Sequence, residues 1–295
     1  MRTITRLHPA QRDDIGDLVT RRPVPGPQIA NIGAFLFLNH HGPQTYGPNN
    51  RGLPFGPHPH RGFETVTFIL EGELAHTDSA GHESVIRAGG VQWMTAGSGI
   101  VHAEVSPASF KRTGGPLEIL QLWVNLPARL KMTAPRYVGV QAEGIPAIAA
   151  EGATVHLISG DYQGRSGAIE SLTGVFLTWV ELQPGAEIRF DGLSGRDVFL
   201  YSARGVFAVD EVTVPRFTLA ELGDGDSVTL TASEPALLVF GHADPIDEPI
   251  VSHGPFVMNT VEEIRQAFAD YQAGTFGVAE IVEAKGDSTH ADDVG

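Results

Sequence analysis

Two short stretches of the chain carry side chains that are well suited to bind a metal ion. A proline separates His58 from His60, and an alanine separates His102 from Glu104. Side chains at positions i and i+2 of a β-strand point to the same face, so each pair can present two ligand atoms in one direction. Two such strands facing each other would bring together three imidazoles and one carboxylate. We therefore expect these four residues to bind a metal ion.

Glu64 is a second acidic residue that could take part in this site. It shares even numbering with His58 and His60, as does an apolar row made of Val66, Phe68 and Leu70. If the strand continues through Gly62, the histidines belong to this core-facing row, although a glycine can also introduce a bulge. Glu64 could then replace Glu104 as a ligand, or hold a ligand histidine by a hydrogen bond. We favour Glu104, because Glu64 lies about 13 Å from His60 along an extended strand at ~3.3 Å per residue.

The other histidines stand apart from the two pairs. His40 and His41 are adjacent and would point in opposite directions along an extended strand. The isolated histidines are His76, His82, His156, His242 and His253. We expect these to be surface residues or hydrogen-bonded core residues.

Composition limits the kinds of function that the chain can have. The chain has 295 residues and no cysteine, so a bound metal must take nitrogen and oxygen ligands. Its net charge of −15, without a cluster of lysine or arginine, repels phosphate backbones, so we expect no direct nucleic-acid partner. No apolar run approaches the ~18 to 20 residues that span a bilayer, and the N-terminus lacks an apolar signal segment. We expect a cytoplasmic protein that does not bind membranes.

The elements that must position the ligand pairs are predicted to be β-strands. Alternating apolar runs are interrupted by Gly, Pro or Asp at intervals of roughly 8 to 12 residues, as in an antiparallel sandwich or barrel. A weak internal repeat aligns residues 68–72 with residues 199–205, and the same offset aligns His58 and His60 with Arg189 and Asp191. The pattern predicts two β domains, of which the second lacks the ligands. Arg189 and Asp191 could pair with each other, but we favour a solvated loop for both.

One helix is predicted near the C-terminus. Thr260 and Glu263 have the spacing of a capping box, and Gly274 can end the helix. Apolar residues recur between them at helical spacing, at Val261, Ile264, Phe268 and Tyr271. This helix should pack on a sandwich face. The chain becomes strongly polar beyond Glu283, which predicts a frayed tail.

Five stretches of the sequence resemble the pirin family of the cupin superfamily. They are residues 58–67 (HPHRGFETVT), 70–72 (LEG), 92–97 (QWMTAG), 99–104 (GIVHAE) and 254–260 (GPFVMNT). The resemblance implies an all-β bicupin of two jelly-roll domains with a short C-terminal helix. Carried over position by position, the pirin metal ligands fall on His58, His60, His102 and Glu104. The metal in the family is usually Fe(II), and Mn, Ni, Co, Cu or Zn could take its place.

The resemblance and the strand pattern together predict how the chain divides. Residues 1–135 would form the N-terminal metal-binding cupin domain, and residues 136–250 a C-terminal cupin domain without metal ligands. Residues 251–285 would carry the helix back onto the sandwich, and residues 286–295 would form a flexible tail.

The resemblance implies two main kinds of function. Bacterial pirin relatives resemble quercetin 2,3-dioxygenases, which implies an oxygenase that acts with dioxygen on a small aromatic substrate such as a flavonol. Glu104 would then also be the catalytic base that takes the proton of a flavonol hydroxyl. Eukaryotic pirins imply the alternative, a non-enzymatic, redox-responsive iron protein that binds a transcription factor or another protein partner. A sugar isomerase is a third option, but the chain has no basic cluster for a sugar phosphate.

The pocket beside the metal is expected to be apolar. Candidate wall residues are Phe55, Trp93, Met94, Gln121 and Trp123. Each of them could equally be an ordinary core residue of its strand.

Overall fold

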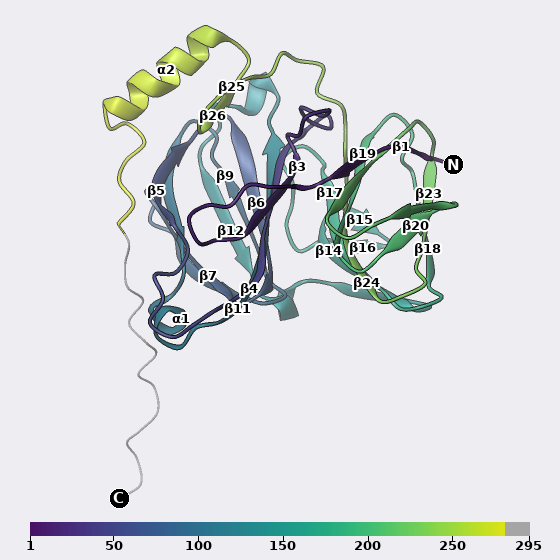
Figure 1. Ribbon diagram of the computed structural model, residues 1–295. Coiled ribbons are helices and arrows are strands. Elements are labelled where there is room, and N and C mark those ends of the chain that lie inside the picture. The colour runs from purple at the N-terminus through teal and green to yellow at the C-terminus, as the bar shows by residue number, and fades with distance from the viewer. Residues whose placement is uncertain (281–295) are drawn as a thin grey trace, which may run out of the picture.

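The computed structural model describes residues 1–280, which form two β-sandwiches that lie side by side (Figure 1). Within these residues the α-helices are α1 (Ala108–Thr113) and α2 (Val261–Gln272), and the 3-10 helices are η1 (Ala128–Leu130) and η2 (Ala142–Gly144). The expected all-β fold with a short C-terminal helix is therefore confirmed. No helix in this part of the chain is long and apolar enough to cross a bilayer.

The first sandwich consists of a seven-stranded sheet and a four-stranded sheet. In spatial order, the strands of the larger sheet are β12 (Arg136–Val140), β9 (Val91–Thr95), β6 (Phe63–Glu71), β11 (Gly115–Asn125), β4 (Phe35–Tyr46), β3 (Thr20–Val24) and β2 (Gln11–Arg12). Those of the smaller sheet are β5 (Phe55–His60), β10 (Ile100–Val105), β7 (Glu73–Asp78) and β8 (Glu83–Arg87).

The second sandwich repeats this arrangement strand for strand. Its larger sheet contains β1 (Ile4–Pro9), β22 (Thr218–Leu222), β19 (Asp197–Arg204), β24 (Ala236–Ala243), β17 (Phe176–Leu182), β14 (Ala153–Ser159) and β13 (Ala147–Ala150). Its smaller sheet contains β18 (Glu187–Asp191), β23 (Ser227–Thr231), β20 (Phe207–Val209) and β21 (Val212–Val214). β6 and β19 occupy the same place in the two sheets, in agreement with the alignment of residues 68–72 and 199–205. Two hairpins lie outside these sheets, β15 (Asp161–Tyr162) with β16 (Arg165–Ser166) and β25 (Val251–His253) with β26 (Phe256–Met258).

Each half of the chain contributes its first strand to the opposite sandwich. β1 pairs with β22 at the edge of the second larger sheet, and β12 pairs with β9 at the corresponding edge of the first. The expected division between residues 135 and 136 does not hold for these two strands. A local apolar pattern predicts that a segment is a strand, but it carries no information about which sheet edge the strand joins.

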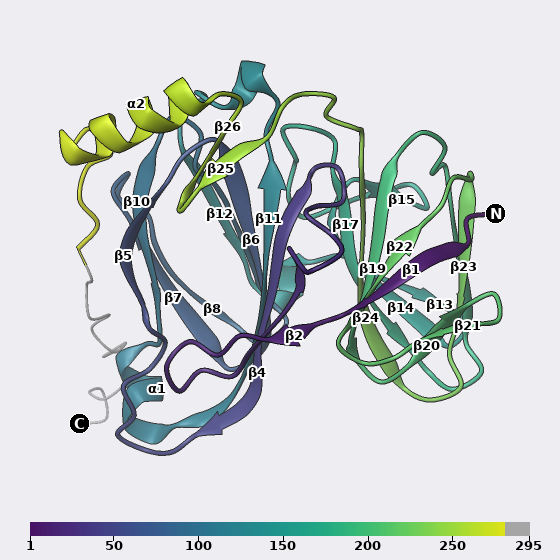
Figure 2. The same ribbon diagram turned by 45° about the horizontal axis from the view of Figure 1, so that its top comes forward.

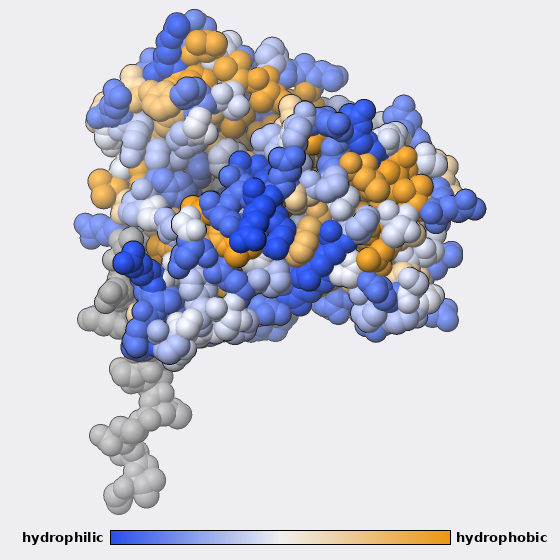
Figure 3. All heavy atoms as spheres, viewed as in Figure 1, coloured by the Kyte–Doolittle hydropathy of each residue, from blue (hydrophilic) through white to orange (hydrophobic). Residues whose placement is uncertain are grey.

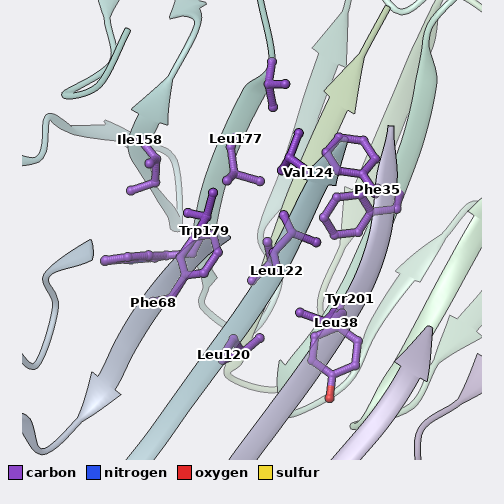
Figure 4. Packing of buried hydrophobic residues seen from close by; sticks show 14 of the residues in the cluster. Phe35, Leu38, Phe68, Leu120, Leu122, Val124, Ile158, Leu177, Trp179 and Tyr201 are labelled. Atoms are coloured by element: carbon purple, nitrogen blue, oxygen red, sulfur yellow. The ribbon is translucent and has the colours of Figure 1, made fainter. Parts of the chain in front are cut away.

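The two seven-stranded sheets pack face to face, and their contact is the largest part of the apolar core. Figure 4 shows side chains from both sheets meeting there. The labelled residues of the first sandwich are Phe35, Leu38, Phe68, Leu120, Leu122 and Val124, and those of the second are Ile158, Leu177, Trp179 and Tyr201. β6 therefore lies between two cores, and its residues from Phe63 to Ile69 are all buried.

The sequence suggested that His58 and His60 continue the even-numbered, core-facing row of β6. The structure shows that they do not. Gly62 separates the two strands, and they belong to different sheets. Its φ of +86° and the carbonyl oxygen of Val257, which a Cβ would approach to 2.0 Å, require a glycine at this corner. Val66 and Phe68 face the other sandwich, whereas Thr67 hydrogen-bonds to Glu104 inside the first one.

The C-terminal segment returns from the second sandwich and covers one end of the first (Figure 2). The capping box at the start of α2 is present, with Thr260 as the N-cap and Glu263 as its partner. The helix packs mainly on the β25–β26 hairpin, in an apolar cluster that also includes Val101 of β10. Val261 and Tyr271 are exposed, so the buried face of α2 is narrower than predicted. The predicted tail, residues 286–295, lies outside the described residues.

The interior of the second sandwich is apolar where the first carries histidines. Ile188 and Phe190 of β18 are buried in its core, whereas Arg189 and Asp191 are exposed and form an ion pair of 2.8 Å. They lie on a strand and not in the expected loop. The face of the molecule seen in Figure 3 is largely hydrophilic, with hydrophobic side chains gathered near α2 and on the second sandwich.

Candidate metal centre

The structure brings His58, His60 and His102 together inside the first sandwich. β5 and β10 are antiparallel neighbours, and their register sets His58 directly opposite His102. One ring nitrogen from each of the three residues lies within 4.8 Å of the others. Within residues 1–280 this is the group of histidine and acidic side chains that has the spacing of metal ligands.

Hydrogen bonds to backbone carbonyls orient two of the three imidazoles. His58 Nδ1 donates to the carbonyl of Gly56 at 2.7 Å, and His60 Nδ1 donates to that of Pro255 at 3.2 Å. Each bond assigns the ring proton to Nδ1 and leaves Nε2 with a free lone pair. The carbonyl of Pro255 comes from the β25–β26 hairpin, so the C-terminal segment helps to orient a residue of the cluster.

The third imidazole, that of His102, lacks hydrogen-bond partners within residues 1–280. Both ring nitrogens of His102 are buried and have no hydrogen-bond partner in the described part of the chain. Burial lowers the pKa of His60 to about 3 and holds the pKa of His102 well below its usual value, so both rings are neutral at pH 7. Neutral imidazole is the form that binds metals. The two neutral rings, the neighbouring imidazole of His58 and the unpaired nitrogens of His102 together fit a divalent transition-metal ion.

Glu104 lies two residues after His102 on β10 and is buried, but its carboxylate is not part of the close histidine group. Its Oε1 accepts hydrogen bonds from Thr67 Oγ1 at 3.0 Å and from the Gln92 side-chain amide. Its Oε2 accepts one from Gln121 Nε2 at 2.6 Å. A carboxylate can accept about four hydrogen bonds, so Oε2 retains one free lone pair.

Glu64 lies on the opposite face of β6, away from the histidines. Its Oε1 accepts a hydrogen bond from Thr95 Oγ1 at 2.6 Å, and its Oε2 is buried without a partner. Burial raises the pKa of this carboxyl to about 7. It bonds to none of the three histidines, so the idea that it is a ligand or supports one is wrong. The cause is the change of sheet at Gly62.

Aromatic rings form a wall beside the histidine cluster. Trp123 lies 5.4 Å from His60 between ring centroids and stacks on Phe37 at 4.6 Å. Phe63 contacts both, at 5.0 Å from His60 and 4.4 Å from Trp123. Trp123 was predicted as a wall, whereas Phe37 and Phe63 were not. Phe63 was missed because the sequence pattern placed the even-numbered residues of this segment on the core face, and Phe63 has an odd number.

The other predicted wall residues have different surroundings. Trp93 lies in the core between the two sandwiches, so its assignment to the pocket is wrong. Gln121 faces the interior through its bond to Glu104, and Met94 packs with Ala96 and Ile100 inside the first sandwich. Phe55 packs in a separate apolar cluster of this sandwich.

His76 is close to the cluster, although its sequence position suggested an isolated residue. Its ring lies 5.5 Å from that of His102 and stacks on Tyr137 at 4.0 Å. Its Nε2 donates to Asp78 Oδ2 at 3.1 Å, and Asp78 is also bound by His82. The i, i+2 spacing of His76 and Asp78 could have predicted this contact, because both side chains lie on the same face of β7.

The exchanged strand β12 also reaches this site. Tyr137 donates from its hydroxyl to Gln92 Oε1 at 3.2 Å, and Gln92 then donates to Glu104. Burial raises the pKa of Tyr137 above its usual value, so the hydroxyl stays protonated and remains a donor. The second half of the chain thus helps to orient the carboxylate of Glu104.

Comparisons with known proteins match nearly the whole chain. A family model described as Pirin matches residues 17–124, and one described as Pirin C-terminal cupin domain matches residues 177–277. A pirin-like protein of Solanum lycopersicum is 38% identical over 91% of this chain and 90% of its own length. The pirin of Homo sapiens is 38% identical over 92% and 91%. The crystal structure of a quercetin 2,3-dioxygenase from Acinetobacter baumannii superposes with a TM-score of 0.88 at 33% identity, covering 94% of this chain and 99% of that one.

Proposed function

This chain belongs to the pirin family of two-domain cupins, and from this premise we propose that its first sandwich is a metal-dependent oxygenase of the quercetin 2,3-dioxygenase type. Its substrate would be a flavonol-like aromatic molecule, with dioxygen as the second reactant. The observation that carries the proposal is the cluster of three histidines, in which both ring nitrogens of His102 are buried and unpaired among the described residues. The similarity to the Acinetobacter quercetin 2,3-dioxygenase supports the reaction type.

The proposed ligands are His58, His60 and His102, with Glu104 as the fourth. Fe(II) is the proposed ion, and Mn, Ni, Co, Cu or Zn would suit the same nitrogen and oxygen donors. When bound, the ion would supply Lewis-acid and one-electron chemistry, with coordination positions left for small molecules. The free lone pair on Glu104 Oε2 is the one available for this ligation.

Glu104 is also the proposed catalytic base. In this role the free lone pair of Oε2 takes the proton of a flavonol hydroxyl in place of binding the ion, which leaves the substrate oxygen with the negative charge. Gln92, Gln121 and Thr67 are all donors to the carboxylate, so they hold it in position as an acceptor. The half-buried rings of Trp123 and Phe37 offer flat apolar surfaces on which the substrate can lie, and the buried ring of Phe63 packs against Trp123.

The test is turnover of quercetin by the full chain. The protein is loaded anaerobically with ferrous iron and mixed with quercetin and oxygen, and the flavonol absorbance and oxygen uptake are followed. His60→Ala should abolish turnover and reduce bound iron, whereas Glu104→Gln should slow turnover by about 10²-fold or more while the histidines retain iron. His156→Ala, in the second sandwich, is the matched control and should behave as the wild type.

The outcome also separates this proposal from its alternative. Stoichiometric iron without quercetin turnover would contradict the oxygenase and favour the metal-dependent binding protein. Full activity in Glu104→Gln would leave the oxygenase in place but remove Glu104 as the base.

A further inference from the structure

The second sandwich has a hollow lined by aromatic rings at the place that corresponds to the histidine cluster of the first. Because the strand orders match, β4 and β11 of the first sandwich correspond to β17 and β24 of the second. Phe37 and Trp123 are register partners in the first pair of strands and stack beside His60. Phe176 and His242 are register partners in the second pair, and their rings stack at 4.6 Å with only 7° between their planes.

A hollow of about 350 Å³ opens beside this second stacked pair. Phe176 and Phe190 line it from the sandwich, and Tyr162 lines it from the β15–β16 hairpin. The ring of Tyr162 lies 5.3 Å from that of Phe190. Gly160 lets the hairpin approach this closely, because a Cβ there would meet the Phe176 ring at 2.8 Å. A volume of this size suits a bicyclic molecule, and the rings of Phe176, Phe190 and Tyr162 form part of its lining.

A hydrogen bond from Arg196 determines which ring nitrogen of His242 carries the proton. The guanidinium Nε of Arg196 donates to His242 Nδ1 at 2.5 Å, so the neutral ring carries its proton on Nε2. Burial and the nearby Arg196 lower the pKa of His242 to about 3, which keeps the ring neutral at pH 7. Among the residues that the structure describes, none accepts a hydrogen bond from Nε2. His242 therefore offers a donor to a molecule in the hollow.

The charges around the hollow disfavour an anionic ligand. Arg196 already donates to Asp244 at 2.5 Å and to the carbonyl of Gly174 at 2.9 Å, so its cationic group is engaged. The carboxylates of Asp161 and Asp191 also line the hollow. An anion would meet these two carboxylates, whereas an uncharged acceptor would not.

We propose that this hollow binds an uncharged, planar aromatic molecule that carries a hydrogen-bond acceptor. The ring lies against the aromatic side chains, and the acceptor takes the Nε2 proton of His242. The site uses no metal and is separate from the proposed oxygenase centre, so it does not depend on that activity.

The probe for this proposal is coumarin, an uncharged bicyclic lactone, compared with coumarin-3-carboxylate, which has the same rings and a negative charge. Binding to the full chain is measured by calorimetry and by saturation-transfer NMR. We expect one coumarin site in the second sandwich and at least tenfold weaker binding of the carboxylate. His242→Phe keeps a ring on Phe176 but removes the donor, and should weaken coumarin binding about tenfold.

Matched variants locate the site. His156→Phe makes the same substitution elsewhere in the second sandwich and should leave the affinity unchanged. Trp123→Ala, in the first sandwich, should also leave it unchanged. Loss of binding in Trp123→Ala with retention in His242→Phe would assign the probe to the first sandwich and overturn the proposal, as would no coumarin binding at all. If His242→Phe does not fold, Tyr162→Ala tests the same hollow, and unchanged affinity in that variant overturns the proposal.

Discussion

At the scale of single residues, the first sandwich holds several buried polar groups that have no partner among the described residues, and those of His102 and Glu64 lead to predictions. Both ring nitrogens of His102 are unpaired, and so is Oε2 of Glu64. A buried polar group without a partner costs about 1–3 kcal/mol. A metal ion would satisfy one nitrogen of His102. Glu64 faces the other sandwich, and protonation of its carboxyl is the simpler way to reduce its cost.

The first prediction concerns Glu64 and pH. Burial raises the pKa of its carboxyl to about 7 from 4.5, so the folded chain retains a proton that the unfolded chain loses. The wild type therefore loses stability as pH rises from about 4.5 to about 7. Glu64→Gln lacks this titration. We expect its free energy of unfolding to gain about 3 kcal/mol on the wild type between pH 4 and pH 8, measured by urea denaturation.

Glu170→Gln is the control for this experiment. Glu64 and Glu170 both line a small hollow between the sandwiches, but Glu170 is exposed. Because burial causes the effect at Glu64, we expect Glu170→Gln to show no comparable change of stability with pH. A Glu64→Gln difference that stays constant from pH 4 to pH 8 would contradict the prediction, because it would show that the carboxyl has the same pKa in the folded and the unfolded chain.

The sequence predicted the histidine cluster but not the faces of its neighbours. The i, i+2 spacing was enough to find His58, His60 and His102, because both strands of the pair keep that parity. Glu64 and Trp93 were assigned to the wrong core, since β6 and β9 are buried on both faces and alternation there does not distinguish two interiors. Phe63 was missed for the same reason. The support from Pro255 depends on a contact about 195 residues away, which local patterns do not encode.

At the scale of elements, the C-terminal hairpin is tied to the histidine-bearing strand by a buried lysine. Lys131 Nζ donates to the carbonyl of Gly62 at 2.8 Å, to Asn125 Oδ1 at 2.7 Å and to the carbonyl of Val257 at 3.0 Å. It thus joins the corner after β5, the end of β11 and strand β26. Pro255, two residues before Val257, holds His60. The lysine therefore connects the hairpin to the geometry of the cluster.

The second prediction is that Lys131→Met destabilises the protein and weakens the metal site. The variant leaves three buried acceptors without their donor, so we expect a loss of about 3 kcal/mol or more in the free energy of unfolding. Metal affinity should fall about tenfold, because the carbonyl that orients His60 is no longer fixed. Chemical denaturation and metal titration measure the two effects. Lys111→Met on α1 is the control and should leave metal affinity unchanged. Wild-type metal affinity in Lys131→Met would show that the hairpin contact does not influence metal binding.

At the scale of the whole molecule, two features join the sandwiches into one unit. The larger sheets share a continuous apolar core, and β1 and β12 are exchanged between them. The regular spacing of turns and the weak repeat were sufficient to predict two sandwiches of one architecture. The exchange was not predictable, because β1 and β12 have ordinary strand patterns and pair with segments far away in the sequence. The contact between the two larger sheets was not predicted either, because strands that are buried on both faces do not show which face meets which core.

The last prediction is that both sandwiches unfold together. Trp179 belongs to the second sandwich, but its ring packs 5.9 Å from that of Phe68 in the first. Trp179→Ala should cost about 3–5 kcal/mol and lower the urea midpoint of both sandwiches equally. Hydrogen exchange with mass spectrometry can follow peptides from β6 and β9 beside peptides from β19 and β22. Thr154→Ala on β14 is the control and should leave both midpoints near wild type. If the second sandwich lost protection at a lower urea concentration than the first, the shared core and the exchanged strands would not couple them.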